Sequence, residues 1–502
     1  MSLPAVVPAP SSIESGSSGP FAVSAGIRIT GDVDAATALA ALLEARTGVT
    51  LQVADEGEVA LRIEAGEPES YRLTVDDAGV AVVGADAAGL FYGIQTLGQL
   101  VRRAGGEWTV PAVTITDRPR FAYRGVMLDV ARHFQPVETV KAYIDRAAGL
   151  KINALHLHLS DDQGWRIQLA SRPELTELAS GSSIGGDPGG YYTTDDYREI
   201  VAYAASRHLI VVPEIDMPGH THAVGVAYPE LAEPPVMSDE IERVIAEFGG
   251  GVPTPGELYQ GLAVGFSSLK IDDERTYEFV ADVFGELARL TPGPYLHVGG
   301  DESLGTDPDD FAVFMERVTG IVADLGKTPI AWHEAGSAPG LDPGTIGQYW
   351  GYTTPLDGMD DQARAFVANG SRLILSPADA VYLDMKYDES TALGLAWANG
   401  PTSVEAAYSW EPSDIIAGID ESDILGVEAP LWTETVRDLS DIDALAFPRL
   451  AAAAEAAWSP ATGTSELRTW TSFRERVGAL APLWTSLGIG FHASTEIPWV
   501  VE

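Results

Sequence analysis

Residues 152–162 read INALHLHLSDD, an apolar segment that ends abruptly in Ser160, Asp161 and Asp162. Leucine and histidine alternate over residues 155–159, which is typical of a β-strand. Seven other short runs rich in apolar or β-branched residues occur in the chain, and longer segments of helical periodicity separate most of them. The eight predicted strands are residues 125–130, 152–159, 209–215, 295–298, 329–332, 345–350, 372–375 and 424–431. Eight such units predict a closed (β/α)8 TIM barrel rather than an open Rossmann-type sheet.

Helices are predicted between these strands, and several begin at Asp or Thr and end near Gly or Asn, as helix termini prefer. They cover residues 137–150, 194–208, 273–290, 309–325, 360–369, 441–457 and 465–480. Ahead of the barrel, the pattern predicts a small α/β unit with helices on a sheet. Its predicted helices are 35–46 and 87–101, and its predicted strands are 59–63, 71–75 and 80–83. We therefore predict a flexible N-terminus (1–20), a small non-catalytic α/β domain (21–116) and a catalytic barrel (117–502).

Composition excludes several classes of function. The net charge of −42, from 31 basic and 73 acidic residues, argues against a nucleic-acid partner. The chain has no cysteine, which excludes disulfides and thiolate chemistry. No apolar stretch reaches the roughly 18 residues that a membrane span requires. The N-terminus does not resemble a secretory signal, so we expect a cytoplasmic protein as written, or a secreted one if a signal has been removed.

Polar and aromatic residues follow every predicted strand. The C-terminal strand ends of such a barrel meet at one mouth, where active sites lie. A single acidic or aromatic residue at a strand end is more often a helix cap or a core residue. Four tryptophans, several carboxylates and an arginine at one mouth instead favour a sugar site, because indole faces stack on sugar rings and polar groups bind hydroxyls. The residues concerned are Arg132, Asp161, His220, Asp301, Glu302, Trp332, Trp350, Tyr382, Asp384, Trp397, Trp432 and Glu434.

Five segments resemble the motifs of family 20 glycoside hydrolases, the β-N-acetylhexosaminidases. They are LDVARHF (128–134), LHLHLSDDQGWR (155–166), PEIDMPGHT (213–221), HVGGDE (297–302) and APLWTE (429–434). They occur in the family's order from the first predicted strand to the eighth. The resemblance implies an exo-acting, retaining enzyme that removes terminal N-acetylglucosamine or N-acetylgalactosamine from oligosaccharides or glycoconjugates, with no cofactor and no metal. We expect a monomer or a homodimer.

The resemblance also implies substrate-assisted catalysis, in which the 2-acetamido oxygen of the sugar attacks its own anomeric carbon. Glu302 would be the general acid and then the general base, and Asp301 would hold the acetamido N–H. These roles require Glu302 to be protonated while Asp301 is ionised. Gly299 and Gly300 fit this assignment, because successive residues on a regular strand point to opposite faces and only an irregular backbone lets both serve one substrate.

The other site residues take their roles from the same resemblance. Arg132 and Glu434 would bind the C3 and C4 hydroxyls, although an ion pair of Arg132 with Asp129 is a structural alternative. Asp161 and His220 would form a hydrogen-bonded pair that tunes the acid. Trp332, Trp350 and Trp432 would enclose the N-acetyl group and the ring, Tyr382 and Asp384 would bind the acetamido oxygen and the C4 or C6 side, and Trp397 would face the leaving group.

Two features depart from the family pattern. Residues 237–248 form an extra acidic, helix-like segment before three glycines, and we interpret it as a surface insertion rather than a lid. His333 stands beside a wall tryptophan where we expect an acid or an amide, which puts the leaving-group preference in doubt. Two other functions stay open. His156 and His158 have a spacing that can bind zinc in a metal-dependent hydrolase, and the barrel could be a non-catalytic carbohydrate-binding protein.

Overall fold

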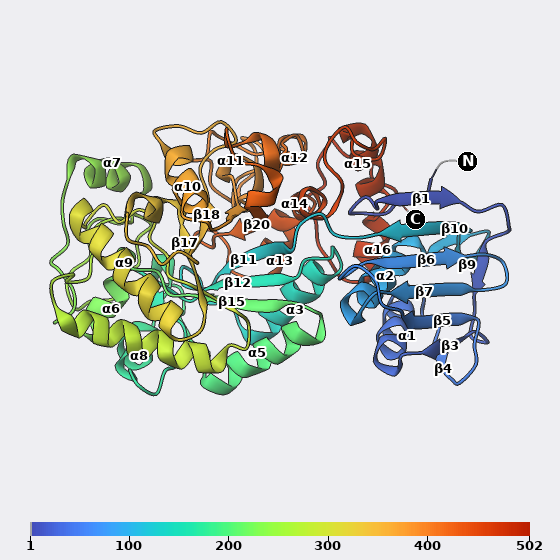
Figure 1. Cartoon of the computed structure of the whole chain (residues 1–502), viewed down its shortest axis with the longest axis horizontal. Coiled ribbons are helices and arrows are strands. Elements are labelled where there is room, and N and C mark those ends of the chain that lie inside the picture. Colours follow the sequence, from blue (N-terminus) through green and yellow to red (C-terminus); the bar gives the residue numbers. More distant parts are fainter. Residues whose placement is uncertain (1–2, 502) are drawn as a thin grey trace.

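The structure, a computed structural model, describes residues 3–501, which form two domains side by side (Figure 1). The small domain extends to strand β10 (Val113–Asp117), and the barrel begins at strand β11 (Tyr123–Asp129). A closed barrel of eight parallel strands follows a small domain of helices on a sheet, so the predicted fold class is confirmed.

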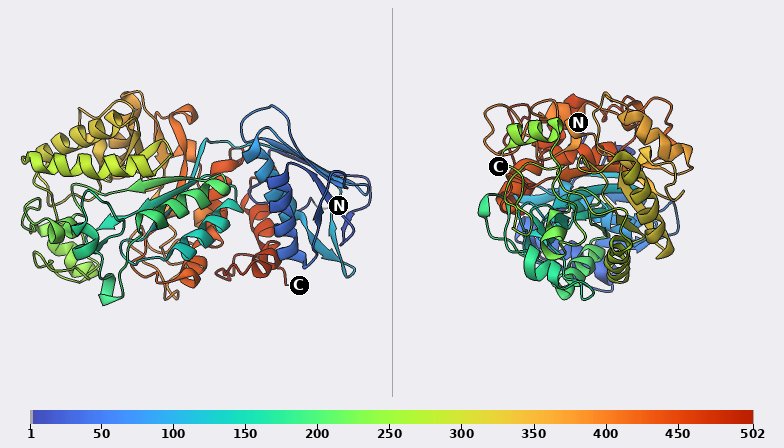
Figure 2. Two further views of the ribbon diagram at one scale, coloured as in Figure 1. Left: turned by 90° about the horizontal axis from the view of Figure 1, so that it is seen from below. Right: turned by 90° about the vertical axis from the view of Figure 1, so that its left-hand side faces the viewer.

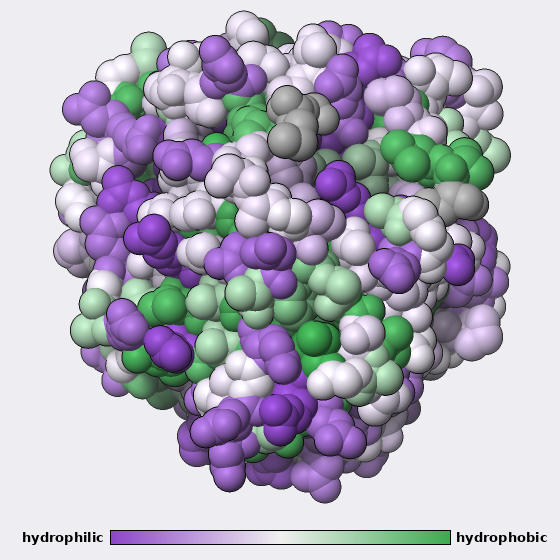
Figure 3. Space-filling model, turned by 90° about the vertical axis from the view of Figure 1, so that its right-hand side faces the viewer, coloured by the Kyte–Doolittle hydropathy of each residue, from purple (hydrophilic) through white to green (hydrophobic). Residues whose placement is uncertain are grey.

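The small domain is built on a seven-stranded sheet. Its order is β1 (Ser12–Ser15), β10, β6 (Tyr71–Val75), β7 (Val80–Gly84), β5 (Val59–Ile63), β3 (Arg28–Gly31) and β4 (Gln52–Val53). A second sheet joins β2 (Phe21–Val23), β9 (Glu107–Val110) and β8 (Arg102–Ala104). Helices α1 (Val33–Thr47) and α2 (Ala87–Leu100) pack on the larger sheet, and α2 buries Leu90, Ile94 and Leu97 at helical spacing. The outer face of this domain mixes hydrophilic and hydrophobic side chains (Figure 3).

The N-terminal segment, for which we predicted flexibility over residues 1–20, packs against the rest of the chain over residues 6–15. Strand β1 pairs antiparallel with β10, and Val6 and Val7 are fully buried. The backbone N–H of Ala9 donates to Glu455 Oε2 at 2.9 Å, which ties the segment to the barrel. The Ser, Pro and Gly content of the segment concealed these contacts, because they are made with residues far along the chain. Residues 1 and 2 lie outside the described part.

The barrel strands coincide closely with the eight predicted runs. They are β11, β12 (Ala154–His158), β15 (Ile210–Glu214), β16 (Tyr295–His297), β17 (Thr328–Trp332), β18 (Ile346–Tyr349), β19 (Leu373–Leu375) and β20 (Ile424–Leu431). Each pairs in parallel with its neighbour in chain order, and β20 pairs with β11 to close the barrel. A short hairpin of β13 (Ser160–Asp161) and β14 (Gly164–Trp165) follows β12.

Helices surround the barrel. They are α3 (Val137–Ala148), α4 (Glu174–Ala179), α5 (Thr194–Ser206), α6 (His222–Ala227), α7 (Asp239–Phe248), α8 (Glu274–Leu290), α9 (Pro308–Asp324), α10 (Met359–Ala368), α11 (Ala378–Val381), α12 (Val404–Tyr408), α13 (Leu439–Ala446), α14 (Arg449–Trp458), α15 (Trp470–Gly478) and α16 (Ala481–Ser486). The single helix predicted for 441–457 is wrong, because α13 and α14 are separate. Pro448 lacks an N–H and disfavours helical angles at Phe447.

The two domains meet in a buried polar contact. Lys151 and Asp117 are fully buried, and Lys151 Nζ lies 2.9 Å from Asp117 Oδ2 and 3.0 Å from the Tyr71 hydroxyl. The Trp458 indole donates to the same carboxylate at 3.0 Å. Helix α16 packs on α1, so the C-terminal helices, red in the left view of Figure 2, lie between the small domain and the barrel. The barrel mouth therefore faces away from the small domain (Figure 1). No described helix is long and apolar enough to cross a membrane.

Candidate active site

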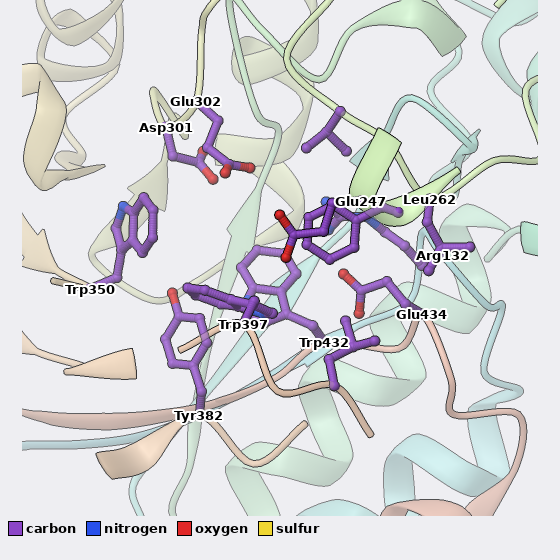
Figure 4. Close-up of a pocket in the computed structure, with 13 residues that line it drawn as sticks. Arg132, Glu247, Leu262, Asp301, Glu302, Trp350, Tyr382, Trp397, Trp432 and Glu434 are labelled. Carbon is purple, nitrogen blue, oxygen red and sulfur yellow. The ribbon is translucent and has the colours of Figure 1, made fainter. Parts of the chain in front are cut away.

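A pocket of about 280 Å³ lies at the C-terminal ends of the barrel strands. Residues from loops after several strands line it, as expected for a TIM barrel. The lining residues are Arg132, Glu247, Phe248, Leu262, Val264, Asp301, Glu302, Trp350, Tyr382, Leu395, Trp397, Trp432 and Glu434 (Figure 4). Eight of the twelve predicted site residues are among them, and the four that are not, Asp161, His220, Trp332 and Asp384, are buried.

Asp301 and Glu302 both point into this pocket because the backbone ahead of them is irregular (Figure 4). Gly299 and Gly300 follow β16 with φ of 71° and 103°, and Glu302 itself has φ of 43°. A Cβ on Gly299 would lie 1.7 Å from Asp216 Oδ1, so no other residue fits there without displacement. The Gly300 N–H donates to the same oxygen at 2.9 Å, which fixes the turn.

The two acidic side chains have different surroundings. Burial among protein atoms and the adjacent Asp301 carboxylate raise the pKa of Glu302, while the nearby His220 opposes the rise. The Glu302 side chain is nevertheless 41% exposed, so a substrate atom can reach it through the pocket. Asp301 is more buried, and its Oδ1 has no hydrogen-bond partner among residues 3–501. The geometry thus places an accessible carboxyl group, Glu302, beside a more buried one, Asp301.

His220 lies directly behind this pair. Its Nε2 is 3.7 Å from Asp301 Oδ2 and 3.8 Å from Glu302 Oε2, and its Nδ1 is 3.2 Å from Asp161 Oδ1. Burial lowers the pKa of His220, but the carboxylates of Asp161, Asp216 and Asp301 outweigh burial and raise it well above its ordinary value. We therefore expect His220 to carry a positive charge at neutral pH. The family resemblance predicted that Asp161 and His220 form a hydrogen-bonded pair close to the acid.

Arg132 is buried at the opposite side of the pocket. Its guanidinium lies 2.8 Å from Asp161 Oδ2 and 3.6 Å from Asp129 Oδ2, so the structural ion pair that we considered is present as well. The guanidinium also stacks 4.7 Å from the centre of the Trp432 ring. Glu434 lines the pocket close to Arg132, and its Oε2 is buried with no partner among the described residues. Burial raises the pKa of Glu434 to about 7, although Arg132 opposes the rise.

Aromatic side chains form the floor and walls of the pocket. Trp350, Trp397 and Trp432 line it directly, whereas Trp332 is fully buried in the same apolar cluster, with ring centres 6.1 Å from Trp432. Tyr382 packs against Trp397 at 5.7 Å, and burial followed by the charge of Asp301 raises the pKa of its hydroxyl well above 10. The Tyr382 hydroxyl is therefore a hydrogen-bond donor at any ordinary pH.

Asp384 and His333 are buried and are not among the residues that line the pocket. Both oxygens of Asp384 are buried and have no partner among residues 3–501, and burial together with Glu434 raises its pKa well above the ordinary value. Asp384 is buried and does not line the pocket, and its contact with the substrate stays a prediction. His333 is buried against Trp350, and burial lowers its pKa to about 3. The acceptor for the Trp350 indole is the next residue, Glu334, at 2.9 Å, so His333 does not reach the leaving-group side.

The acidic segment 237–248 is not merely a surface insertion, and that interpretation is wrong. It forms helix α7, whose last two residues, Glu247 and Phe248, line the pocket together with Leu262 and Val264 of the following loop. The sequence contained one usable signal, an amphipathic helix that ends in an aromatic residue before three glycines. No pattern of spacing indicated that this end of the helix turns toward the mouth.

Histidines and acids that could hold a metal lie beneath the pocket. Among the described residues, His156, Glu214 and His297 form one such group, but these side chains already pair with each other. His156 Nε2 lies 3.1 Å and His297 Nδ1 lies 3.0 Å from Glu214 oxygens, and the Trp332 indole donates to Glu214 at 2.8 Å. All four residues are fully buried, so this group cannot contact a substrate in the pocket. Glu214 is thus already in contact with both histidines and accepts from the Trp332 indole.

Comparison with known proteins gives a consistent result over the whole chain. Residues 3–118 match the sequence profile "Glycosyl hydrolase family 20, domain 2", and residues 121–310 and 303–461 match "Glycosyl hydrolase family 20, catalytic domain". A β-N-acetylhexosaminidase of Cellulomonas fimi is 41% identical over 99% of this chain and 97% of that protein.

Solved structures agree. One described as a glycoside hydrolase family 20 β-N-acetylglucosaminidase is 67% identical, with a TM-score of 0.91 over 99% of this chain and all of that chain. The Streptomyces plicatus N-acetyl-β-hexosaminidase in complex with Thio-NAglucal is 46% identical, with a TM-score of 0.90 over 99% of this chain and 97% of that one.

Proposed function

The chain belongs to glycosyl hydrolase family 20 and is a β-N-acetylhexosaminidase, and we propose that Asp301 and Glu302 carry its catalysis. The observation that supports this assignment best is the placement of both carboxyl groups in one tryptophan-lined pocket with unlike surroundings. Burial raises the pKa of Glu302, which favours its protonated form. The positive charge of His220, 3.7 Å from Asp301 Oδ2, stabilises the ionised form of Asp301. A glycosidase of this kind needs one protonated and one ionised carboxyl group, and Glu302 and Asp301 fit these two roles.

The reaction proceeds without a protein nucleophile. The acetamido oxygen of the substrate attacks the anomeric carbon while Glu302 donates its proton to the departing glycosidic oxygen. Asp301, which lines the pocket, accepts a hydrogen bond from the acetamido N–H and stabilises the positive charge of the oxazolinium intermediate. The Tyr382 hydroxyl donates to the acetamido oxygen and orients it. Glu302, now ionised, then takes a proton from the water that opens the intermediate, and the product keeps the β configuration.

Arg132 and Glu434 bind the hydroxyls at the non-reducing end of the sugar. Glu434 lines the pocket beside Arg132, and Arg132 is held in place by Asp161 and Asp129. A pocket that ends at these two side chains accepts one terminal sugar and no further residue beyond it, which is exo action. Trp350, Trp397 and Trp432 supply apolar surfaces for the ring and the acetamido methyl. The substrates are glycans with a terminal β-linked N-acetylhexosamine, and a monomer or homodimer stays our prediction for the assembly.

The test is turnover of a 4-nitrophenyl N-acetyl-β-glucosaminide followed by proton NMR. We expect the β-anomer of N-acetylglucosamine to form first and then to mutarotate. The α-anomer as first product would contradict substrate-assisted catalysis. Binding of N-acetylglucosamine without any turnover would instead support the non-catalytic carbohydrate-binding alternative, and loss of activity on prolonged treatment with chelators would support the metal-dependent one.

A further inference from the structure

Helix α7 is attached to the loop that carries the proposed catalytic pair. Its apolar side buries Ile241 against Tyr259 and Phe266, in a small cluster separate from the main core. Leu304, two residues beyond Glu302, packs against the same cluster. The segment after α7 is also held from the barrel side, because the Gln163 side chain donates to the Gly261 carbonyl at 2.9 Å. The helix is therefore a fixed part of the mouth.

The C-terminal end of α7 places the Glu247 carboxylate in the lining of the pocket. Ser238 caps the first turn by accepting from the Ile241 N–H at 3.2 Å, and the helix stops at Gly249, which has φ of 78°. Glu247 and Phe248 stand just before that stop. Figure 4 shows Glu247 extending into the pocket between the Asp301–Glu302 pair and the side formed by Arg132 and Glu434. Glu247 is exposed there, so its carboxylate is accessible to a ligand in the pocket.

Acidic side chains outnumber basic ones in the lining of the pocket, although Glu302 is proposed to be protonated. Four of the described lining residues are acidic, namely Glu247, Asp301, Glu302 and Glu434. Arg132 is the one basic residue among them, and its guanidinium is already paired with two buried carboxylates behind the wall. An anionic substituent that comes close to Glu247 would meet an exposed carboxylate, whereas the two cations of the site, Arg132 and His220, already face buried carboxylates. Glu247 is the acidic member of this set that the proposed catalysis does not use.

We propose that Glu247 is a specificity-determining residue that makes the pocket reject N-acetylhexosaminides bearing an anionic group, such as a sulfate ester. The inference rests on the proposed function, because it concerns the same pocket. Repulsion between like charges a few ångströms apart at a partly exposed site is large enough to change relative rates several-fold, and salt weakens it. Helix α7, which carries Glu247, thereby influences substrate choice.

The experiment compares two substrates that differ by one negative charge, 4-methylumbelliferyl N-acetyl-β-glucosaminide and its 6-sulfate. The selectivity ratio is kcat/KM for the sulfated substrate divided by that for the neutral one. We expect this ratio to rise about three- to ten-fold in Glu247→Gln and further in Glu247→Lys, and the gain to shrink in 1 M NaCl. Glu242→Gln, which removes an exposed charge from the same helix outside the pocket, is the matched control and should keep the wild-type ratio.

A ratio that stays at the wild-type value in both Glu247 variants would overturn the inference, as would an equal rise in the Glu242 control. Turnover of the neutral substrate by the wild type is measured in the same assay. Its absence would count against the proposed function itself, so the two failures are distinguishable.

Discussion

His220 Nε2 lies within 3.8 Å of Glu302 Oε2, so a histidine that carries a positive charge stands directly behind the proposed acid. Burial raises the pKa of Glu302, and His220 limits the rise. An acid must be protonated to act, so kcat/KM should fall as pH increases through the pKa of Glu302. In His220→Asn the opposing charge is gone, and we expect this alkaline limb to move to higher pH. A pH–rate profile in which the limb moves to lower pH would show that His220 does not act on Glu302 in this way.

Glu302→Gln should lower kcat/KM for a substrate with a poor leaving group by about 100- to 10,000-fold, because the departing oxygen loses its proton donor. A dinitrophenyl glycoside, whose leaving group needs little protonation, should lose much less. Steady-state rates on both substrates test this, with thermal unfolding of the variant as the control for folding. Equal losses on both substrates would contradict the role of Glu302 as the acid.

Asp301→Asn should lower kcat by roughly 100- to 1,000-fold, the range seen when a preorganised electrostatic contact is removed. The amide cannot offer the negative charge that stabilises the oxazolinium. KM should change far less than kcat, because most contacts to the sugar remain. A variant that loses affinity but retains kcat would place Asp301 in binding alone.

Arg132→Ala should damage both substrate binding and stability. Asp161 and Asp129 are fully buried and would lose their arginine partner, but Asp161 keeps His220 and Asp129 keeps the N–H and hydroxyl of Thr433. We therefore expect a cost of at most about 3–5 kcal/mol, the range for a buried charge left without any partner. We expect KM to rise, and chemical denaturation to show a lower free energy of unfolding. Glu434→Gln is the comparison variant, because it should raise KM without a similar loss of stability. Unchanged stability of the arginine variant would mean that the ion pairs contribute little.

Gly299→Ala should disrupt the turn that places the catalytic pair. Its Cβ would lie 1.7 Å from Asp216 Oδ1, in addition to the cost of a left-handed backbone at φ of 71°. Gly326→Ala is a matched control, since that glycine has φ of 75° but open space around it and should lose only about 1–2 kcal/mol. We expect the Gly299 variant to lose stability beyond this value and most activity. Similar effects of the two substitutions would show that the close approach to Asp216 is unimportant.

Local patterns predicted the barrel well because each strand is a short apolar run with its polar residues at one end. The run 424–431 coincides with β20, and the mouth residues Trp350, Tyr382 and Trp432 follow from the strand ends. Patterns of this kind carry no information on contacts between distant segments. The ordering of the N-terminal segment depends on Glu455, more than 400 residues away, and the approach of Glu247 to the mouth depends on the packing of Ile241 on a later loop.

The buried contact between Lys151 and Asp117 has a consequence for the chain as a whole. Burial lowers the pKa of Lys151, and the Asp117 carboxylate across the domain boundary, together with the Tyr71 hydroxyl, stabilises its ammonium group. Separating the small domain from the barrel would leave Lys151 and Asp117 without each other, and the Trp458 indole would lose its acceptor, Asp117. The barrel therefore depends on the small domain for its stability. We expect differential scanning calorimetry to show a single unfolding transition for the two domains rather than two.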